Sequence, residues 1–336
     1  MIAHRRSLIA QSAEKDGWRS AWRPLISGQR RAPVSPPRPT QKAMHAGVRV
    51  ARITGTQAHM IHGKTTLIPH IGYPTESFKA PMIYNPWFDR QGIDAAVIPM
   101  GVKPDDYATV FPALFRMTNI RGALVTMPHK VATVELVDEL TPAARIAGAC
   151  NAVLRRDDGT LVGGQFDGEG FVRGILRKGC RLEGARAIVS GSGGVGSAIA
   201  ASLAAAGVAE LALFDARETA ARALAHRLAE HYPALRVSIG SADPDGYDVV
   251  VNATPLGMQP GDPLPFDVAR IAPGAIVGEV VMKQEYTPLL QAALARGCKV
   301  QVGTDMLFEM IPAYLEFFGY GTATPDALRE VAQIRY

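Results

Sequence analysis

The sequence predicts an α/β fold in two parts, and three observations support this prediction. From about residue 48 onward, short apolar runs rich in β-branched residues alternate with segments whose apolar residues recur at helical spacing. The chain has 336 residues, which is enough for two domains with sizeable cores. A glycine-rich stretch, GSGGVG, follows one strand-like run and opens the strong helix former SAIAASLAAAG. Strand–helix alternation of this kind predicts a mostly parallel sheet covered by helices.

The first part is expected to hold several strands and two helices. The strand-like runs are ARITGT (a strand or hairpin piece), LIPHIGYP, AAVIPMGV and ALVTMP. The helical candidates are DDYATVFPALFRMT and KVATVELVDELTPAARIAG. We expect this part to span residues 48–153 and to follow a basic tail, residues 1–47, that has no sustained periodicity and is expected to be disordered.

The second part is expected at residues 154–303. Its strand-like runs are ARAIVSG, VAELALFD, DVVVNATP, GAIVGEVV and CKVQVG, separated by the glycine loop and by helical segments. The last two helical segments, MLFEMIPAYLEFFG and PDALREVAQIRY, fall in residues 304–336, and we expect them to pack back on the first part.

Charge and cysteine usage exclude several classes of function. Residues 1–47 hold nine Lys or Arg and two acidic residues, so the remaining residues carry 27 basic and 29 acidic groups and have no basic stripe for a nucleic-acid backbone. No apolar run is long enough to cross a membrane. The three cysteines, Cys150, Cys180 and Cys298, form no CxxC pair, which favours a reducing cytoplasm over a disulfide framework. Histidine spacing predicts no metal site.

The glycine loop predicts a dinucleotide-binding site. Glycines at this spacing permit a tight turn and a close approach of the backbone to a pyrophosphate, which the helix N-terminus then binds. The residues expected to take part are Gly191, Gly193, Gly194, Val195 and Gly196. Asp215 ends the next strand-like run, 19 residues beyond Gly196. A carboxylate there accepts hydrogen bonds from ribose hydroxyls and repels a 2′-phosphate, so we expect NAD in preference to NADP, although Arg217 offers a contact to a phosphate.

Several motifs together resemble the shikimate dehydrogenase family, which includes quinate/shikimate dehydrogenases. The similar segments run from about Gly72 to the C-terminus: GYPTESFKAPMIYN, GALVTMPHK, AGACNAV, GGQFDGEGF, VNATPLGM and GTDML. The resemblance implies a two-domain, NAD(P)-dependent alcohol dehydrogenase of aromatic amino acid biosynthesis. It also implies further cofactor contacts at Thr254, Pro255, Leu256, Val280 and Gly303.

By this resemblance, Lys130 and Asp167 stand at the positions of the family's catalytic lysine and aspartate. Oxidation of a secondary alcohol requires loss of the hydroxyl proton, and a group within hydrogen-bond reach can accept it. The aspartate would fix the amine and accept hydrogen bonds from the substrate. Thr126 and Asn151 match substrate-binding positions of the same motifs. His129, beside the lysine, is expected to be structural.

The sequence departs from the family pattern where the substrate is bound. Phe78 and Ala80 replace two serines that hold a carboxylate, and neither side chain donates a hydrogen bond. The other departures replace polar side chains of the pattern: Leu124, Ala152, Gln165 with Phe166, Met282 and Met310. Each lost hydrogen bond to a carboxylate costs about 1.5–3 kcal/mol. We therefore expect poor binding of shikimate unless another group such as Lys79 compensates, and a related, less polar or differently anchored cyclic alcohol as the substrate.

Two alternatives remain open at this point. A folate-type methylene dehydrogenase shares a similar organisation with a catalytic lysine, and a dinucleotide-binding sensor would bind the cofactor without catalysis. The preferred interpretation is a dehydrogenase of a small cyclic hydroxy acid or alcohol, monomeric or homodimeric, without a nucleic-acid or membrane partner.

Overall fold

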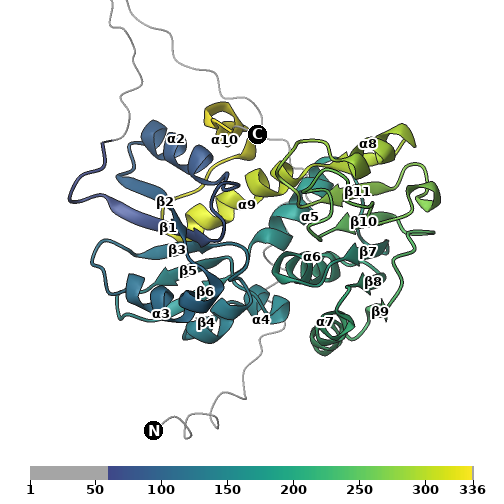
Figure 1. Cartoon of the computed structure of the whole chain (residues 1–336), viewed down its shortest axis with the longest axis horizontal. Helices are drawn as coiled ribbons and strands as arrows, with labels where there is room; N and C mark the ends of the chain where they lie inside the picture. Colours follow the sequence, from purple (N-terminus) through teal and green to yellow (C-terminus); the bar gives the residue numbers. More distant parts are fainter. Residues whose placement is uncertain (1–59, 335–336) are drawn as a thin grey trace, which may run out of the picture. The chain divides into compact units, whose positions relative to one another are not determined.

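The computed structural model describes residues 60–334 of the 336-residue chain. The expected basic tail and the run ARITGT lie outside the described residues. Within them, the α/β prediction is confirmed: two six-stranded sheets alternate with helices along the chain (Figure 1).

The first sheet is mixed and has the strand order β2-β1-β3-β5-β6-β4. Its strands are β1 (Thr66–Gly72), β2 (Ala95–Gly101), β3 (Gly122–Val125), β4 (Glu139–Leu140), β5 (Ala152–Arg155) and β6 (Leu161–Gly164). Strands β1, β2 and β3 are parallel, whereas β5 is antiparallel to both β3 and β6. All four residues of β3 are buried, as expected for a central strand that is covered on both faces.

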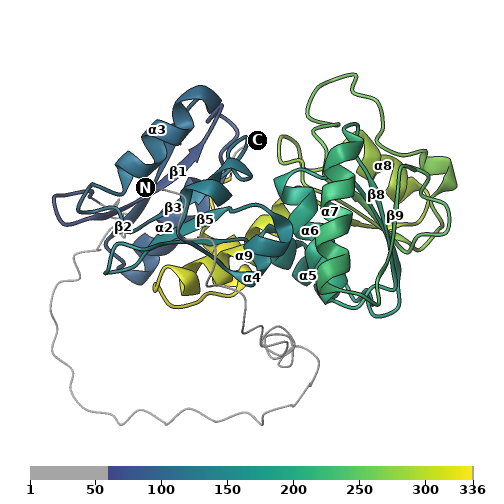
Figure 2. The same ribbon diagram turned by 90° about the horizontal axis from the view of Figure 1, so that it is seen from below.

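Helices cover both faces of this sheet (Figure 2). Helix α2 (Pro81–Gln91) packs Ile83, Tyr84 and Phe88 on one face, where Ile68 of β1 belongs to the same core cluster. Helix α3 (Pro104–Leu114) packs on the other face, in a cluster that includes Ile71 of β1. Alternate residues of one strand thus serve two cores.

The second sheet is parallel throughout and has the order β12-β11-β10-β7-β8-β9. Its strands are β7 (Arg186–Ser190), β8 (Glu210–Phe214), β9 (Arg236–Ile239), β10 (Val249–Asn252), β11 (Ile276–Glu279) and β12 (Lys299–Gln301). In chain order this is the 3-2-1-4-5-6 arrangement of a Rossmann domain, whose switch point lies between β7 and β10.

Helices lie on both faces of the second sheet as well. Helices α6 (Gly194–Ala205) and α7 (Glu218–His231) lie on one face, and α8 (Pro288–Ala295) lies on the other (Figures 1 and 2). A Thr–Pro pair begins α8, as it does α4 (Pro142–Ala147) and α10 (Pro325–Val331). In each, the threonine hydroxyl accepts a backbone N–H and proline occupies the first turn.

Two further helices, α5 (Asp167–Arg177) and α9 (Gly303–Phe317), pack against each other, and α5 also packs against α6. Glycines allow the close approach: a Cβ on Gly168 would collide with the carbonyl of Ala198 in α6, and one on Gly170 would lie 2.6 Å from the carbonyl oxygen of Met306 in α9. Residues of α9 also join the core cluster of β1 and α2, and the Gln333 N–H donates to the Met82 carbonyl.

Several stretches differ from the elements that the sequence predicts. The expected helix over 130–148 is instead the 3₁₀-helix η2 (Ala132–Leu136), the short strand β4 and helix α4. Helix α2, strands β5, β6 and β9, and helix α5 were not expected. Because β6 pairs with β5 and β4, and the second sheet begins only at Arg186, we propose that the domain boundary lies in residues 165–185 rather than at 154.

Candidate active site

The structure brings Lys130 and Asp167 together, although they lie 37 residues apart in the chain. The Lys130 Nζ lies 2.6 Å from Asp167 Oδ2, close enough for a hydrogen-bonded ion pair. The side chains are only 10% and 2% exposed, so water screens this interaction little. A buried amine paired with one carboxylate is an arrangement that can give a proton to, or accept one from, a substrate oxygen.

Lys130 is held by the loop that follows β3. The Thr126 N–H donates to the Ile71 carbonyl and the Tyr73 N–H to the Met127 carbonyl, so this loop is tied to the end of β1. The Cys150 N–H donates to the Lys130 carbonyl. The half-buried Thr126 therefore lies at the same sheet edge as Lys130.

Asp167 is the first residue of α5, where the helix macrodipole favours a negative charge. Two neighbouring amide side chains hold the start of this helix. The Gln165 Oε1 accepts from the Asp167 N–H at 2.9 Å, and the Asn151 Oδ1 accepts from the Phe166 N–H at 3.0 Å. The NH₂ groups of both amides are buried and have no hydrogen-bond partner among the described residues. Each remains able to donate to a bound molecule.

The glycine loop joins β7 to α6 at the switch point of the second sheet. A Cβ on Gly191 would lie 2.7 Å from the Ala253 carbonyl oxygen after β10, and one on Gly196 would collide with the Gly191 carbonyl. These close approaches explain the glycines and leave the N-terminus of α6 facing the crevice that binds dinucleotides in such sheets. The same loop reaches the ion pair, because a Cβ on Gly194 would lie 3.0 Å from the Lys130 Cβ.

Asp215 follows β8 and fixes the glycine loop. Its Oδ2 accepts from the Ser192 N–H at 2.6 Å, and its Oδ1 accepts from the Arg217 N–H at 2.8 Å. The Arg217 side chain is 78% exposed and its Nε lies 4.0 Å from Asp215 Oδ1. Asp215 thus lies at the glycine loop, as its predicted role requires, while the guanidinium of Arg217 points into solvent.

The remaining predicted cofactor residues follow β10, β11 and β12. Thr254 begins the loop after β10; its N–H and its hydroxyl both donate to the Asn252 Oδ1. Leu256 is held in turn by the Thr254 Oγ1, with Pro255 between them. After β11 and β12, a Cβ on Gly303 would lie 3.0 Å from the carbonyl carbon of Val280. These segments all lie at the carboxyl edge of the second sheet.

Apolar residues gather beside the ion pair. Phe166 precedes Asp167 and packs against Tyr314 and Phe317 of α9, with ring centroids 4.9 and 5.3 Å apart. The cluster that these rings join also holds other residues at which the sequence departs from the family pattern: Ala80, Leu124, Ala152, Met282 and Met310.

Two groups near the ion pair were missed from the sequence. His70 of β1 is buried, its Nδ1 has no partner among the residues described, and burial together with the charge of Lys130 lowers its pKa to about 3. Tyr314 donates from its hydroxyl to the Asn151 carbonyl at 3.4 Å, and burial, with the nearby Asp167 charge, raises its pKa well above the usual value. A histidine inside the apolar run LIPHIG was the available signal for the first. Tyr314 gave none, because it occupies a helical core position.

His129 is part of the framework. Its ring stacks on Tyr107 with centroids 3.9 Å apart, and its Nε2 lies 2.7 Å from the Val102 carbonyl oxygen. Burial lowers its pKa. The ring is therefore occupied by contacts within the first sheet and its helix.

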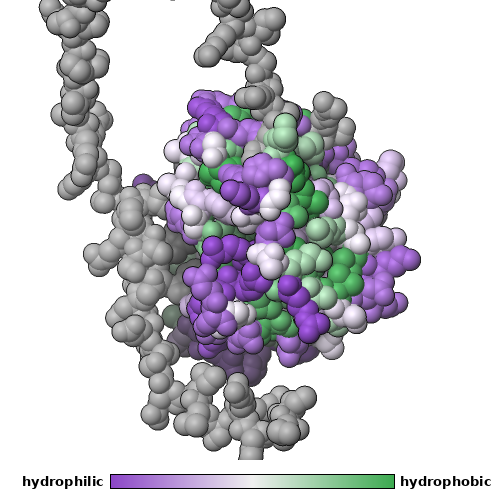
Figure 3. All heavy atoms as spheres, turned by 90° about the vertical axis from the view of Figure 1, so that its left-hand side faces the viewer, coloured by the Kyte–Doolittle hydropathy of each residue, from purple (hydrophilic) through white to green (hydrophobic). Residues whose placement is uncertain are grey.

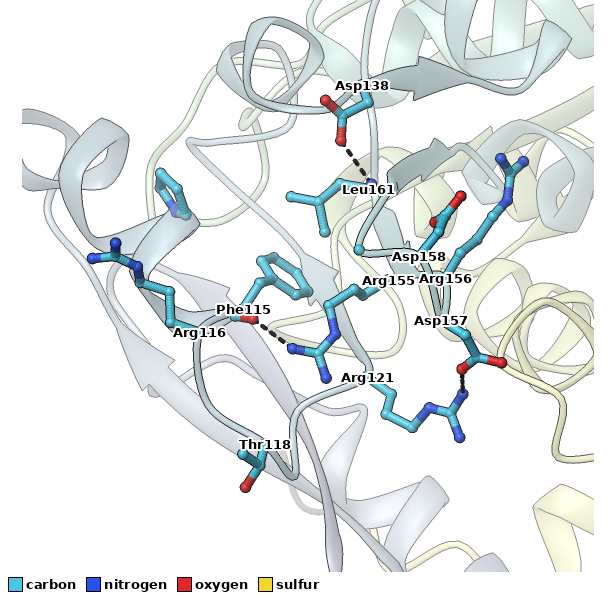
Figure 4. A pocket seen from close by; sticks show the side chains of 12 residues that line it. Phe115, Arg116, Thr118, Arg121, Asp138, Arg155, Arg156, Asp157, Asp158 and Leu161 are labelled. Atoms are coloured by element: carbon cyan, nitrogen blue, oxygen red, sulfur yellow. Dashed lines mark hydrogen bonds and ion pairs between the residues drawn. The ribbon is translucent and has the colours of Figure 1, made fainter.

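A hollow of about 670 Å³ lies at the opposite edge of the first sheet (Figure 4). Two of its arginines bind protein groups: Arg121 binds Asp157 at 2.5 Å, and Arg155 donates to the Phe115 carbonyl at 2.5 Å. Since β3 starts here and Lys130 follows its other end, this hollow is separate from the candidate site.

Within residues 60–334, no cluster of three or more His, Cys, Asp or Glu side chains could hold a metal ion. The helices of this part of the chain are too short or too polar to cross a bilayer. The side of the molecule in Figure 3 mixes hydrophilic and hydrophobic residues over its surface.

Residues 70–153 match the model of the shikimate dehydrogenase substrate binding domain. A protein named shikimate dehydrogenase (NADP(+)), from Acidiphilium cryptum, is 37% identical over 271 residues, which cover 80% of this chain and 96% of that protein. The chain belongs to the shikimate dehydrogenase family. The family prediction is therefore confirmed, and with it the enzyme class, an NAD(P)-dependent oxidoreductase.

Two solved structures agree with this fold. The shikimate 5-dehydrogenase of Listeria monocytogenes, in complex with shikimate and NAD, is 28% identical, with a TM-score of 0.71 over 81% of this chain and 97% of that one. The ligand-free 5-ketofructose reductase of Gluconobacter sp. strain CHM43 is 25% identical, with the same TM-score over 80% and 98% of the two chains. These findings do not favour the folate or sensor alternatives. Because the Acidiphilium relative is named for NADP(+), the comparisons do not support a preference for NAD.

Proposed function

We propose that this chain is an NAD(P)-dependent dehydrogenase that interconverts a secondary hydroxyl and a ketone, in shikimate, quinate or a related cyclic alcohol. The observation that carries this proposal is the position of Lys130, which contacts the Asp167 carboxylate on one side and the glycine loop at Gly194 on the other. A proton-exchanging amine beside a dinucleotide loop is the arrangement that alcohol oxidation needs.

The proton step follows from this pair. On oxidation, the substrate O–H bond breaks, its proton passes to the Lys130 amine, and a C=O bond forms as the hydride leaves the same carbon. On reduction, the Lys130 ammonium returns the proton to the oxygen that becomes the hydroxyl. Asp167 positions the lysine and balances the charge of its ammonium form. NAD(P), when bound, accepts or supplies the hydride.

The residues around the second sheet fit such a cofactor. A Cβ on Gly191 or Gly196 would close the space at the switch point, and the Ser192 hydroxyl is buried without a partner in the described part of the chain. We further infer a preference for NAD, because Asp215 places a negative charge at the end of β8 where an adenosine 2′-phosphate would lie. The exposed Arg217 is the group that would favour NADP instead.

The substrates that we propose are not limited to hydroxy acids. The Gluconobacter protein similar to this chain is named for 5-ketofructose, which has no carboxylate. The Listeria enzyme was solved with shikimate, which has one. The proposed activity therefore covers both charged and uncharged polyhydroxylated compounds, and the residues around the ion pair decide between them.

The test is an assay at 340 nm with NAD and NADP over a panel of cyclic polyols and hydroxy acids. Lys130→Met should lower kcat for any active compound by about 100- to 10,000-fold, because it removes the proton-exchanging group. The dissociation constant for the cofactor should change little. Lys103→Met, an exposed lysine at the start of α3, is the matched control and should retain full activity. Turnover that survives Lys130→Met would remove the lysine from the mechanism.

We also propose a cytoplasmic enzyme that is a monomer or a homodimer. All three cysteines are free thiols, and Cys150 and Cys298 are buried, which suits a reducing compartment. Size-exclusion chromatography with light scattering would determine the oligomeric state.

A further inference from the structure

Apolar residues pack together next to the ion pair, and we call this group the apolar side of the candidate site. Six residues with no charged group and no hydroxyl, each from a different segment of the chain, share one hydrophobic cluster: Ala80, Leu124, Ala152, Phe166, Met282 and Met310. Leu124 of β3 and Ala152 of β5 lie directly opposite each other in the sheet. Tyr314 ties this cluster to the ion pair, because its ring packs on Phe166 and its hydroxyl is close enough to feel the charge of Asp167.

Phe78 extends the apolar side toward Thr126. Its ring centroid lies 4.2 Å from that of His70. A Cβ on Gly72 would lie 2.8 Å from the Phe78 Cζ and would also collide with the Thr126 methyl group, so the ring and the threonine approach the same point. The half-buried ring therefore occupies space between β1 and the Lys130 loop, where it offers no hydrogen bond.

The start of α2 gives a carboxylate no substitute anchor through its first-turn N–H groups. Pro81 has no N–H, and the next three N–H groups are used within the helix turn. Met82 donates to the Lys79 carbonyl, and both Ile83 and Tyr84 donate to the Ala80 carbonyl. A carboxylate docked here would find these donors occupied.

Two basic residues near the site, Lys130 and His70, are poor partners for a second anion. Lys130 is already paired with Asp167. His70 is neutral across the physiological range, because burial and the Lys130 charge lower its pKa to about 3. Burial lowers the pKa of Lys79, and the variant Lys79→Gln below tests whether this lysine binds a carboxylate. A carboxylate buried without a matching charge or donor is strongly disfavoured.

Neutral donors, in contrast, are ready. Asn151 and Gln165 use their carbonyl oxygens to hold the start of α5 and leave buried NH₂ groups without a partner among the described residues. Buried donors are normally satisfied, so groups left over at a candidate site indicate a ligand that accepts hydrogen bonds. Hydroxyl and carbonyl oxygens accept from amides without requiring a counter-charge.

We propose that the substrate is an uncharged polyhydroxylated ketone or secondary alcohol, and that Asn151 and Gln165 donate hydrogen bonds to its oxygens. This inference rests on the dehydrogenase function proposed above. The residues of the apolar side, with Phe78, select against a carboxylate, and the ion pair serves the reacting oxygen.

The test compares shikimate with its analogue in which CH₂OH replaces the carboxylate, so that the ring and its hydroxyls are identical. We expect kcat/KM for the neutral analogue to be higher by about tenfold or more, since shikimate must bury an unmatched charge. Two neutral probes without the ring alkene extend the comparison: myo-inositol is tested for oxidation and 5-ketofructose for reduction. Binding to the cofactor-loaded enzyme is measured in parallel by calorimetry.

Variants assign the preference to residues. In the double variant Phe78→Ser with Ala80→Ser, the ratio of kcat/KM for the neutral analogue to kcat/KM for shikimate should fall by about tenfold or more. The reason is that each new hydroxyl can donate to the carboxylate of shikimate. Leu294→Ser, an exposed leucine on α8, is the control and should leave the ratio unchanged. Gln165→Glu keeps the oxygen that accepts from the Asp167 N–H but removes the NH₂ donor. It should raise KM for the neutral analogue while the melting temperature changes little.

The outcomes separate this inference from the proposed function. A preference for shikimate that Lys79→Gln abolishes would make that lysine a carboxylate anchor and overturn the inference, while turnover dependent on Lys130 would leave the function intact. The inference would also be overturned if the enzyme neither bound nor converted any of the neutral probes. Turnover of the neutral analogue that survives Lys130→Met would instead contradict the proposed function and leave the substrate class standing.

Discussion

The Asp215 carboxylate accepts a 2.6 Å hydrogen bond from the backbone N–H of Ser192, which ties the end of β8 to the glycine loop. One residue therefore shapes the loop and places a charge beside it. A carboxylate at this position is expected to repel a 2′-phosphate, so the proposed preference for NAD and the geometry of the loop depend on the same side chain.

Asp215→Asn should shift selectivity toward NADP. Two like charges about 4 Å apart repel by about 1–4 kcal/mol near a protein surface, so the NADP-to-NAD ratio of kcat/KM should rise by about tenfold or more. In the asparagine, an NH₂ group replaces one of the two oxygens that accept backbone N–H groups, and this loss should lower activity with both cofactors. The ratio of the two activities is unaffected by a loss that both share. Asp105→Asn, at the exposed start of α3, is the control. An unchanged ratio would leave the preference for NAD without a basis.

The Lys130–Asp167 pair should behave as one unit in a double-mutant cycle. Asp167→Asn leaves the buried amine without its counter-charge and should reduce kcat/KM by about 100-fold or more. Once either partner is lost, removing the second should cost little further, so Lys130→Met with Asp167→Asn should be about as impaired as the worse single variant. Effects that simply add would show that the two side chains act independently.

Gly168→Ala should destabilise the protein and impair catalysis together. Its Cβ would collide with the Ala198 carbonyl of α6, and backbone cannot move aside as a flexible side chain can. Overpacking of this kind costs about 1–3 kcal/mol. Because Asp167 is the preceding residue, the shift should also lower kcat. In Gly63→Ala the new methyl group meets no atom within 4 Å among the described residues, so its melting temperature should match the wild type.

The sequence predicts the second sheet better than the first. All five expected strands of the second sheet, from ARAIVSG to CKVQVG, occur as β7, β8, β10, β11 and β12, because buried parallel strands are continuous apolar runs. The expected helix over 130–148 was wrong. Its apolar residues fit helical spacing, but part of this segment forms hydrogen bonds with the first sheet instead of within a helix. The Asp138 N–H donates to the Leu161 carbonyl, and the Thr141 N–H donates to the Gly163 carbonyl.

The candidate site was likewise predicted only in part from the sequence. Lys130 and Asp167 were predicted because their motifs resemble those of a family, and that they would meet was part of this prediction. The role of the surrounding glycines was not foreseen, because Gly168 and Gly170 start a helix whose close packing depends on α6 and α9, far along the chain. His70 and the unpaired amide groups of Asn151 and Gln165 become visible only when burial and hydrogen-bond partners are known.

Glu279 should make the stability of the protein depend on pH in a direction unusual for a carboxylate. It ends β11, is fully buried, and accepts a 2.8 Å hydrogen bond from the Thr287 hydroxyl. Burial raises its pKa from 4.5 to about 7, against smaller opposing effects from hydrogen bonds to Thr287 and Asn252. Between these two pH values the folded protein holds a proton that the unfolded chain has lost, so this group's contribution to stability is complete below pH 4.5 and is lost as pH rises to about 7.

Glu279→Gln removes this titration and keeps an acceptor oxygen for Thr287. The difference in unfolding free energy, variant minus wild type, should therefore rise by about 3 kcal/mol between pH 4.5 and 7.5 and then level off. Urea denaturation at a series of pH values measures it. His70 contributes a slope of the opposite sign, since its pKa is lowered to about 3, but both proteins contain it and the subtraction removes it. Parallel stability curves for the two proteins would mean that Glu279 ionises in the folded state as readily as in the unfolded chain.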